Sequence, residues 1–183
     1  MIEIFDDLIT FSVRAQILHF IQQSNYRLLG WQDRDDFDRE KLDIHSAWSF
    51  EDLQRSNLMP YVEQAIRQSK FNIGIEQYSK CMVNLVQAGD SYYTHTHPGH
   101  YALLYYANLD WFEHYAGETL FFDKFKKEVV RAISFVPGRI VVFDGDIPHT
   151  IRPQSKIGPQ FRFTLTVFFD KTRKLTKQEN FFI

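Results

Sequence analysis

Apolar residues in the first part of the chain recur at the spacing of an amphipathic α-helix. Asp6 and Asp7 stand just before the first such stretch and are suited to cap it, and Pro60 is suited to a first helical turn. The charged stretch 33–40 is predicted to be a surface loop. The helices expected from this pattern cover residues 9–21, 47–53 and 60–68.

After Asn72 the pattern changes to short apolar or alternating runs that are separated by glycine, proline and aspartate turn signals. About eight evenly spaced short strands are typical of an antiparallel sandwich or barrel, and the leading helices would cover one sheet from outside. The predicted class is therefore mainly β with flanking helices. The expected strands cover residues 73–80, 82–87, 100–108, 119–123, 132–136, 139–144, 149–152 and 161–170.

A chain of 183 residues is long enough to bury one substantial core and leaves little room for a second. We therefore expect a single domain over residues 1–183. Its parts would be a helical support over 1–71, a strand-rich core over 72–170 and a C-terminal tail over 171–183.

The composition excludes several classes of partner. A net charge of −2 gives no general attraction to nucleic acid or to an anionic membrane, and the basic runs 124–127 and 171–177 are interpreted as solvated faces. Cys81 is the only cysteine, which excludes an internal disulfide and favours a small core residue. The acidic N-terminus lacks the start of a signal peptide, and no apolar run approaches the ~20 residues of a membrane span. We expect a cytoplasmic protein, compatible with a homodimer.

Three of the seven histidines fall within six consecutive residues. Residues two apart in an extended chain point to the same face, so His95 and His97 can direct two imidazoles at one point. A third ligand must come from a distant segment, and His149, just past a tight turn, is the best candidate. His100 is the alternative to His97, ranked second because on a regular strand it would face away from His95. Iron, zinc, copper and nickel all accept three imidazoles, so the spacing leaves the metal open.

The last predicted strand carries a cation among hydroxyls. Arg162, Thr164 and Thr166 share one face of the strand, and Phe161, Phe163 and Leu165 share the other. An arginine that points inward is costly unless it meets an anion, and its planar fork matches a carboxylate. The alternative is an outward arginine on an edge strand.

The order of these motifs resembles the iron(II)- and 2-oxoglutarate-dependent dioxygenases, especially the prolyl-hydroxylase-like branch. The resemblance spans about half of the chain and keeps the order of the family's motifs. It implies a double-stranded β-helix, or jelly roll, in the core over 72–170. The similar segments begin at Asn84, His95-Thr-His97-Pro-Gly, Leu103, Gly117, Pro137, His149 and Arg162.

The resemblance implies roles for individual residues. His95 and His149 match the first and the distal metal histidines, and Arg162 matches the basic residue that binds the far carboxylate of 2-oxoglutarate. Thr164 matches a position where a hydroxyl often assists that contact. Tyr101 and Tyr105 become candidates for lining the co-substrate pocket, or else ordinary aromatic core.

The resemblance also implies an activity: iron(II), dioxygen and 2-oxoglutarate would hydroxylate a substrate C–H with release of succinate and carbon dioxide. The substrate would be an amino acid, a peptidyl proline-like residue or another small molecule. Loops over a barrel mouth often carry specificity, so the connection 110–116, with Trp111, Phe112 and Tyr115, is a candidate substrate lip.

One position departs from the family pattern. The common motif is His-x-Asp, and this chain has His97 at the third position, as in a His-x-His-Pro variant. Three neutral ligands would leave iron(II) with one more unit of net positive charge than a carboxylate site. The imidazole would also fill the position that a halogenase keeps open for halide, which disfavours halogenation.

Three rival functions stay open at this point. A cupin-like iron dioxygenase would use the three histidines without 2-oxoglutarate and would leave Arg162 without a ligand. A zinc hydrolase is disfavoured because no evident general base accompanies the histidines. A non-catalytic jelly-roll binding protein would bind metal weakly or not at all.

Overall fold

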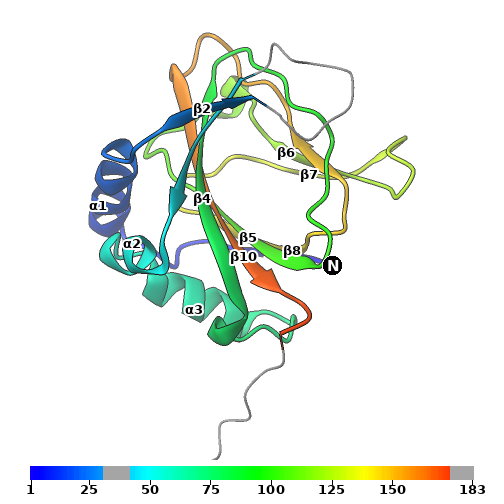
Figure 1. Ribbon diagram of the computed structural model, residues 1–183. Coiled ribbons are helices and arrows are strands. Elements are labelled where there is room, and N and C mark those ends of the chain that lie inside the picture. The colour runs from blue at the N-terminus through cyan, green and yellow to red at the C-terminus, as the bar shows by residue number, and fades with distance from the viewer. Residues whose placement is uncertain (31–41, 174–183) are drawn as a thin grey trace, which may run out of the picture.

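The computed structural model describes residues 1–30 and 42–173, and Figure 1 shows their arrangement. The expected loop 33–40 and most of the tail 171–183 lie outside the described residues. No helix in the described part is long and apolar enough to cross a membrane. The elements are β1 (Ile2–Phe5), α1 (Phe11–Gln22), β2 (Arg27–Gly30), β3 (Leu42–Trp48), α2 (Phe50–Arg55), α3 (Met59–Gln68), the 3₁₀ turn η1 (Ile75–Gln77), β4 (Tyr78–Gln87), β5 (His100–Tyr106), the 3₁₀ turn η2 (Glu113–Tyr115), β6 (Thr119–Phe122), β7 (Val129–Ile133), β8 (Ile140–Asp144), β9 (His149–Ile151) and β10 (Phe161–Asp170).

The strands form two antiparallel sheets that enclose a common interior. The larger sheet has the order β1-β8-β5-β10-β4-β3-β2, and the smaller has the order β7-β6-β9. Strands that follow one another in the chain repeatedly lie in different sheets, as β5 and β6 do, which is the arrangement of a double-stranded β-helix. The predicted class, mainly β with flanking helices in a jelly roll, is confirmed.

The N-terminal part contributes strands as well as helices. β1 pairs with β8 and β3 pairs with β4, so both extend the larger sheet. These strands and β2 were not predicted. β1 has only four residues, and residues 47 and 48, expected to begin a helix, are instead the end of β3. That helix, α2, begins at Phe50, where a reciprocal capping box between Ser49 and Asp52 starts it.

The other element boundaries differ by a few residues from the expected ones. Thr10 rather than Asp6 or Asp7 precedes α1, and Asp6 instead binds Arg139 through two hydrogen bonds of 2.7 and 2.9 Å. β4 runs without a break over a stretch that was predicted as two strands, and η1 replaces the start of the first. Pro60 lies in the first turn of α3, and β10 has the predicted bounds.

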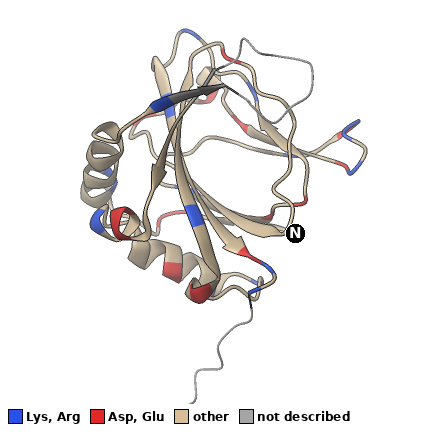
Figure 2. Ribbon diagram, viewed as in Figure 1, with Lys and Arg blue, Asp and Glu red and all other residues tan. Residues whose placement is uncertain are grey.

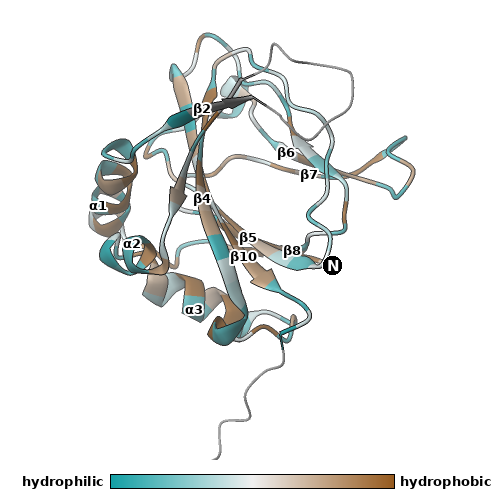
Figure 3. Cartoon of the chain, viewed as in Figure 1, coloured by the Kyte–Doolittle hydropathy of each residue, from teal (hydrophilic) through white to brown (hydrophobic). Residues whose placement is uncertain are grey.

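The larger sheet has two faces with separate cores. The three helices cover its outer face, on the side away from β6 and β7 (Figures 1 and 3), and bury a large cluster that includes Ile17, Leu53 and Leu165. The inner face and the smaller sheet bury a second cluster that includes Phe121 and Phe143. Cys81 belongs to the outer cluster, as expected of a core residue, and burial raises the pKa of its thiol.

Lys171, the first residue after β10, forms ion pairs with the turn between β8 and β9. The Lys171 ammonium lies 2.5 Å from a carboxylate oxygen of Asp144 and 2.7 Å from one of Asp146. Elsewhere charged residues lie mainly on the outside of the helices and at the ends of strands, and the tip of the β6–β7 hairpin carries both signs (Figure 2).

Candidate active site

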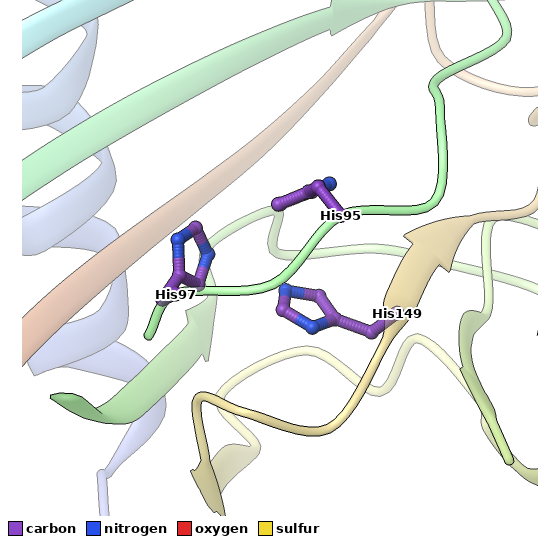
Figure 4. A group of neighbouring side chains, drawn as sticks. All are labelled: His95, His97 and His149. Atoms are coloured by element: carbon purple, nitrogen blue, oxygen red, sulfur yellow. The ribbon is translucent and has the colours of Figure 1, made fainter. Parts of the chain in front are cut away.

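Three histidine side chains converge between the two sheets. His95 and His97 come from the segment between β4 and β5, and His149 is the first residue of β9 (Figure 4). Their ring centroids lie 4.5 to 5.0 Å apart, and their candidate ligand atoms lie within 4.8 Å of one another. This spacing lets the three imidazoles share one metal ion. The structure thus brings together the three histidines that the sequence selected.

Backbone hydrogen bonds fix the two segments that carry these side chains. His95 and His149 exchange two backbone bonds, of 3.0 and 2.9 Å. The His97 amide donates to the Gly145 carbonyl at 2.7 Å, and the Gly145 amide donates to the His100 carbonyl at 2.9 Å. A Cβ atom at Gly145 would lie 2.5 Å from the His97 carbonyl oxygen, so only glycine fits where the two segments meet.

The same local geometry sets which ring nitrogens face the centre of the cluster. The Nδ1 atoms of His95 and His149 lie 3.0 and 2.8 Å from the carbonyl oxygens of Tyr93 and Ile147. A carbonyl can only accept a hydrogen bond, so each Nδ1 carries the proton and each Nε2 keeps its lone pair. A hydrogen bond from the second ring nitrogen to a carbonyl is a common support for a metal-ligating histidine.

Burial keeps the imidazoles of His97 and His149 neutral. Burial, helped by the neighbouring histidines, lowers the pKa of His97 to about 2 and that of His149 to about 4. His97 packs against Phe168 at 4.6 Å and His149 against Phe143 at 4.9 Å, both measured between ring centroids. Neutral imidazole is the form that binds metal.

His100, the alternative ligand, does not join the cluster. Its Nδ1 lies 3.0 Å from the Pro98 carbonyl, and its Nε2 faces the Ser79 hydroxyl at 3.5 Å. It is the first residue of β5 and lies across from Asp170, the last residue of β10. His97 is therefore the residue whose imidazole lies beside His95 and His149.

The three histidines line a cavity of about 180 Å³ between the two sheets. This is smaller than the roughly 300–1,000 Å³ that drug-sized ligands occupy, so it suits a small organic molecule. Its walls combine apolar side chains with hydroxyls, and the lining found in the described part of the chain includes no carboxylate. The polar lining residues are Asn84, Tyr92, Thr119, Thr150, Thr164, Thr166 and Arg162, with the three histidines.

Arg162 is the cation of this cavity, and it is fully buried. Its Nε donates to the Gly117 carbonyl at 3.2 Å, whereas neither of its two terminal nitrogens has a hydrogen-bond partner among residues 1–30 and 42–173. Burial lowers the pKa of Arg162 to about 10, so the guanidinium stays charged at neutral pH. A buried charge with two unsatisfied donor groups is costly by itself, and a carboxylate ligand would satisfy both.

Aromatic rings form the wall behind this guanidinium. Its carbon lies 5.4 Å from the ring centroid of Tyr106 and 5.0 Å from that of Phe135. The Tyr106 hydroxyl is held by the Thr119 hydroxyl at 2.7 Å. No pattern in the sequence indicates Tyr106, because β5 is apolar on both faces and shows no alternation.

Tyr101 and Tyr105, the predicted pocket residues on β5, do not line the cavity. Both belong to the outer cluster beneath the helices, and Tyr105 is fully buried there. Successive residues of a strand face opposite sides, so the inner face of β5 carries Leu104 and Tyr106 instead. The co-substrate pocket role expected of these two tyrosines is therefore not supported, whereas Thr164 does line the cavity beside Arg162.

The candidate lip 110–116 is divided between a packed and an exposed part. Trp111 stacks on Phe135 at 4.1 Å, and its indole nitrogen donates to the Ala116 carbonyl at 2.8 Å. Phe112 is more than half exposed. Trp111 thus supports the aromatic wall behind Arg162, and Phe112 is the aromatic residue that faces solvent.

Comparisons with known proteins identify the fold. No protein-family model matches the chain, and no curated protein matches it significantly in sequence. A prolyl hydroxylase of Trichoplax adhaerens, solved with a peptide fragment of the oxygen degradation domain of hypoxia inducible factor, superposes with a TM-score of 0.69. The two share 18% identity over 93% of this chain and 83% of that one.

Two further solved structures point to the same class. A prolyl-4-hydroxylase of Pseudomonas putida gives a TM-score of 0.66 at 20% identity, over 92% of both chains. The viral collagen prolyl hydroxylase of Paramecium Bursaria Chlorella virus-1, solved with 2-oxoglutarate, gives 0.59 at 13% identity, over 91% of this chain and 94% of that one. The chain therefore has the jelly-roll fold of the 2-oxoglutarate- and iron(II)-dependent oxygenases.

Proposed function

We propose that this protein is an iron(II)- and 2-oxoglutarate-dependent oxygenase with His95, His97 and His149 as metal ligands and Arg162 as the co-substrate anchor. The observation that carries the proposal is the fully buried guanidinium of Arg162 in the same cavity as the three imidazoles, with two nitrogens that form no hydrogen bond to any described residue. The fold of known oxygenases supports it. The whole chain would act as one domain.

The residues present fit both groups. Three neutral imidazoles are suitable ligands for iron(II), and they leave positions open for other ligands. The fork of Arg162 fits the far carboxylate of a dicarboxylic acid, and the Thr164 hydroxyl lies in the same row of β10 to assist it. Iron with 2-oxoglutarate and dioxygen supplies oxidising chemistry that hydroxylates a C–H bond and releases succinate and carbon dioxide.

The protein's own part in that chemistry is binding, orientation and the exclusion of water. Arg162 sets the direction in which a dicarboxylate lies, and the apolar side chains of Leu104, Phe143 and Phe168 keep the space around the histidines dry. The substrate would be an amino acid, a peptidyl residue such as proline or another small molecule. The Trichoplax neighbour, solved with a peptide, motivates the peptidyl option.

His97 gives the proposed site a character of its own. The described lining of the cavity has no carboxylate, so a divalent metal there would keep its full charge, with Arg162 as a further cation. Such a site attracts dianions strongly, which favours a dicarboxylate co-substrate. The cupin-like alternative, which uses no 2-oxoglutarate, leaves the two guanidinium nitrogens without a role.

The deciding experiment is an anaerobic titration of the iron(II)-loaded protein with 2-oxoglutarate, followed by visible absorption. We expect a weak charge-transfer band that saturates as the co-substrate chelates the metal. Arg162→Met should raise the Kd for 2-oxoglutarate by the equivalent of about 2–5 kcal/mol, because it removes one partner of a buried charge pair, and should leave iron binding intact.

Two outcomes would overturn the proposal. Iron binding without any band would favour the cupin-like dioxygenase. A protein that binds no iron under these conditions would point to a zinc site or to a non-catalytic binding protein. Arg152→Met is a suitable control, because Arg152 is an exposed arginine whose ion pair with Glu118 is 3.2 Å long.

A further inference from the structure

The strands β4 and β10 carry the inner wall of the cavity from one end to the other. In their antiparallel register Val86 lies across from Arg162, Met82 across from Thr166 and Lys80 across from Phe168. Partners in such a ladder point to the same face. Lys80 therefore continues the row of Met82, Asn84 and Val86, and lies one step beyond the residues that line the cavity.

Exposure along this row shows which end of the cavity is open. Val86 and Arg162 are buried, Met82 is partly exposed and Lys80 is exposed. Arg162 and Phe168 lie six positions apart on β10, which is roughly 20 Å along a strand. The row of residues is thus buried at the Arg162 end of the cavity and exposed at the Lys80 end, which we take as the open end.

Phe168 contacts both His97 and Lys80. Its ring centroid lies 4.6 Å from that of His97, and the Lys80 ammonium lies 4.9 Å from the same Phe168 ring. A lysine over an aromatic ring buries its stem against the ring and keeps its ammonium in water. The ammonium is therefore held beside the candidate metal cluster, on the side opposite Arg162.

The charges around Lys80 leave it available to a ligand. It takes part in none of the ion pairs found within residues 1–30 and 42–173. The nearby carboxylate of Asp170 accepts two hydrogen bonds from Thr172, at 2.8 and 2.7 Å. Lys171, the next cation, is engaged by Asp144 and Asp146.

We propose that Lys80 binds a carboxylate of the primary substrate, with Phe168 as the apolar platform beneath it, so that the substrate is a small carboxylic acid such as a free amino acid. This inference rests on the proposed function, since it places the substrate between Lys80 and the metal. A single ammonium suits one monoanionic group, whereas a phosphate is usually held by several donors. Only the last residue of a peptide offers its α-carboxylate, so an internal peptidyl residue fits less well.

The test measures binding rather than turnover. The iron(II)-loaded protein, kept anaerobic with saturating 2-oxoglutarate so that the Arg162 end is filled, is titrated calorimetrically with the common L-amino acids and with their carboxamides. We expect at least one amino acid to bind. Its carboxamide should bind at least about tenfold more weakly, because it lacks the carboxylate that accepts a charge-assisted hydrogen bond from Lys80.

Three variants decide the role of Lys80. Lys80→Met should weaken binding of the acid about tenfold, and Lys80→Arg should restore most of it. Lys124→Met is the matched control, because the Lys124 ammonium also lies over a phenylalanine ring, 4.8 Å from that of Phe125, on the β6–β7 hairpin. It should bind the acid as the unchanged protein does.

The results separate this inference from the proposed function. The charge-transfer band of 2-oxoglutarate, recorded on the same samples, should persist in Lys80→Met. Absence of that band from the unchanged protein would count against the proposed function. With the band present, acids that bind equally well to Lys80→Met, amides that bind as well as acids, or no binding by any acid would each overturn the role of Lys80.

Discussion

The two faces of the larger sheet are made by the same strands and serve opposite purposes. On β10 the outward residues, such as Phe163, Leu165 and Val167, pack beneath the helices in an apolar cluster. The inward residues Arg162 and Thr164 face a cavity and are also buried. One strand therefore packs beneath the helices with one set of residues and lines the cavity with the alternate set. Burial alone does not distinguish the two.

The largest effect should come from the inner face at His149. His149→Ala removes one of the three imidazoles. Loss of a group that only supports a metal ligand lowers metal affinity by about 10–100-fold, so loss of the ligand itself should lower iron affinity by more. The cavity can still form, so the folded state should persist. Equilibrium dialysis with metal analysis measures the loss, and circular dichroism checks the fold. Retained iron at full stoichiometry would contradict the assignment of His149.

A substitution on the outer face should have the converse effect. Leu165→Ala empties a fully buried position and should lower the free energy of unfolding by about 2–5 kcal/mol. The Kd for 2-oxoglutarate should be nearly unchanged at a temperature where the variant is folded. Ile157→Ala, at a position that is 71% exposed, should change stability by less than about 0.5 kcal/mol. A large change in co-substrate affinity in Leu165→Ala would break the division between the faces.

Acid should lower the free energy of unfolding, because the inner face buries imidazoles in their neutral form. Below pH 6.5 the unfolded chain protonates its histidines, whereas burial holds the pKa of His149 at about 4 and that of His97 at about 2. The unfolded state then binds more protons than the folded state, so the metal-free protein should lose stability as the pH falls from 6.5 toward 4. The loss should be on the order of a few kcal/mol. Urea unfolding at several pH values measures it.

A control variant isolates the histidine contribution from that of the carboxylates. His149→Gln cannot take up a proton, so its stability should depend less steeply on pH over the same interval. An equal slope in both proteins would show that His149 does not cause the acid sensitivity. Added iron should steepen the fall, because metal binding requires the deprotonated ligands.

The smallest effect should come from a single hydroxyl. Thr164→Val keeps the shape of the side chain and removes the hydroxyl proposed to bind the far carboxylate, so the affinity for 2-oxoglutarate should fall by about 0.5–1.5 kcal/mol. The free energy of unfolding should change little, because valine suits a strand. Thr150→Val is a useful comparison, since the Thr150 hydroxyl donates to the Tyr92 carbonyl at 2.7 Å and serves the fold. An unaltered affinity in Thr164→Val would remove Thr164 from the proposed anchor.

Sequence patterns could predict the histidine cluster and the inward face of β10 for a physical reason. His95 and His97 are two residues apart in extended chain, and Arg162 stands on a strand whose alternation of polar and aromatic residues fixes its two faces. β5 lacks such alternation, and so its pattern does not indicate that Tyr106 faces inward and that Tyr101 and Tyr105 face the helices.

Other features depend on contacts that no local pattern encodes. β1 is a strand because the edge of β8 offers it partners, and Ile2–Phe5 alone is too short to signal this. Trp111 turns inward because Phe135, far along the chain, provides the surface on which it stacks. The open end at Lys80 likewise follows from the register of β4 with β10, which pairs residues 88 positions apart (80 with 168).

Gly145 has a consequence for sequence variation within this protein. It has no side chain and takes no part in the proposed chemistry, yet a Cβ there would lie 2.5 Å from one backbone oxygen, of His97, and 2.6 Å from another, of His100. Neither oxygen can move without shifting the segment between the histidines. In a library that samples every residue at each position, selection for metal binding should tolerate changes at many lining residues and accept only glycine at position 145.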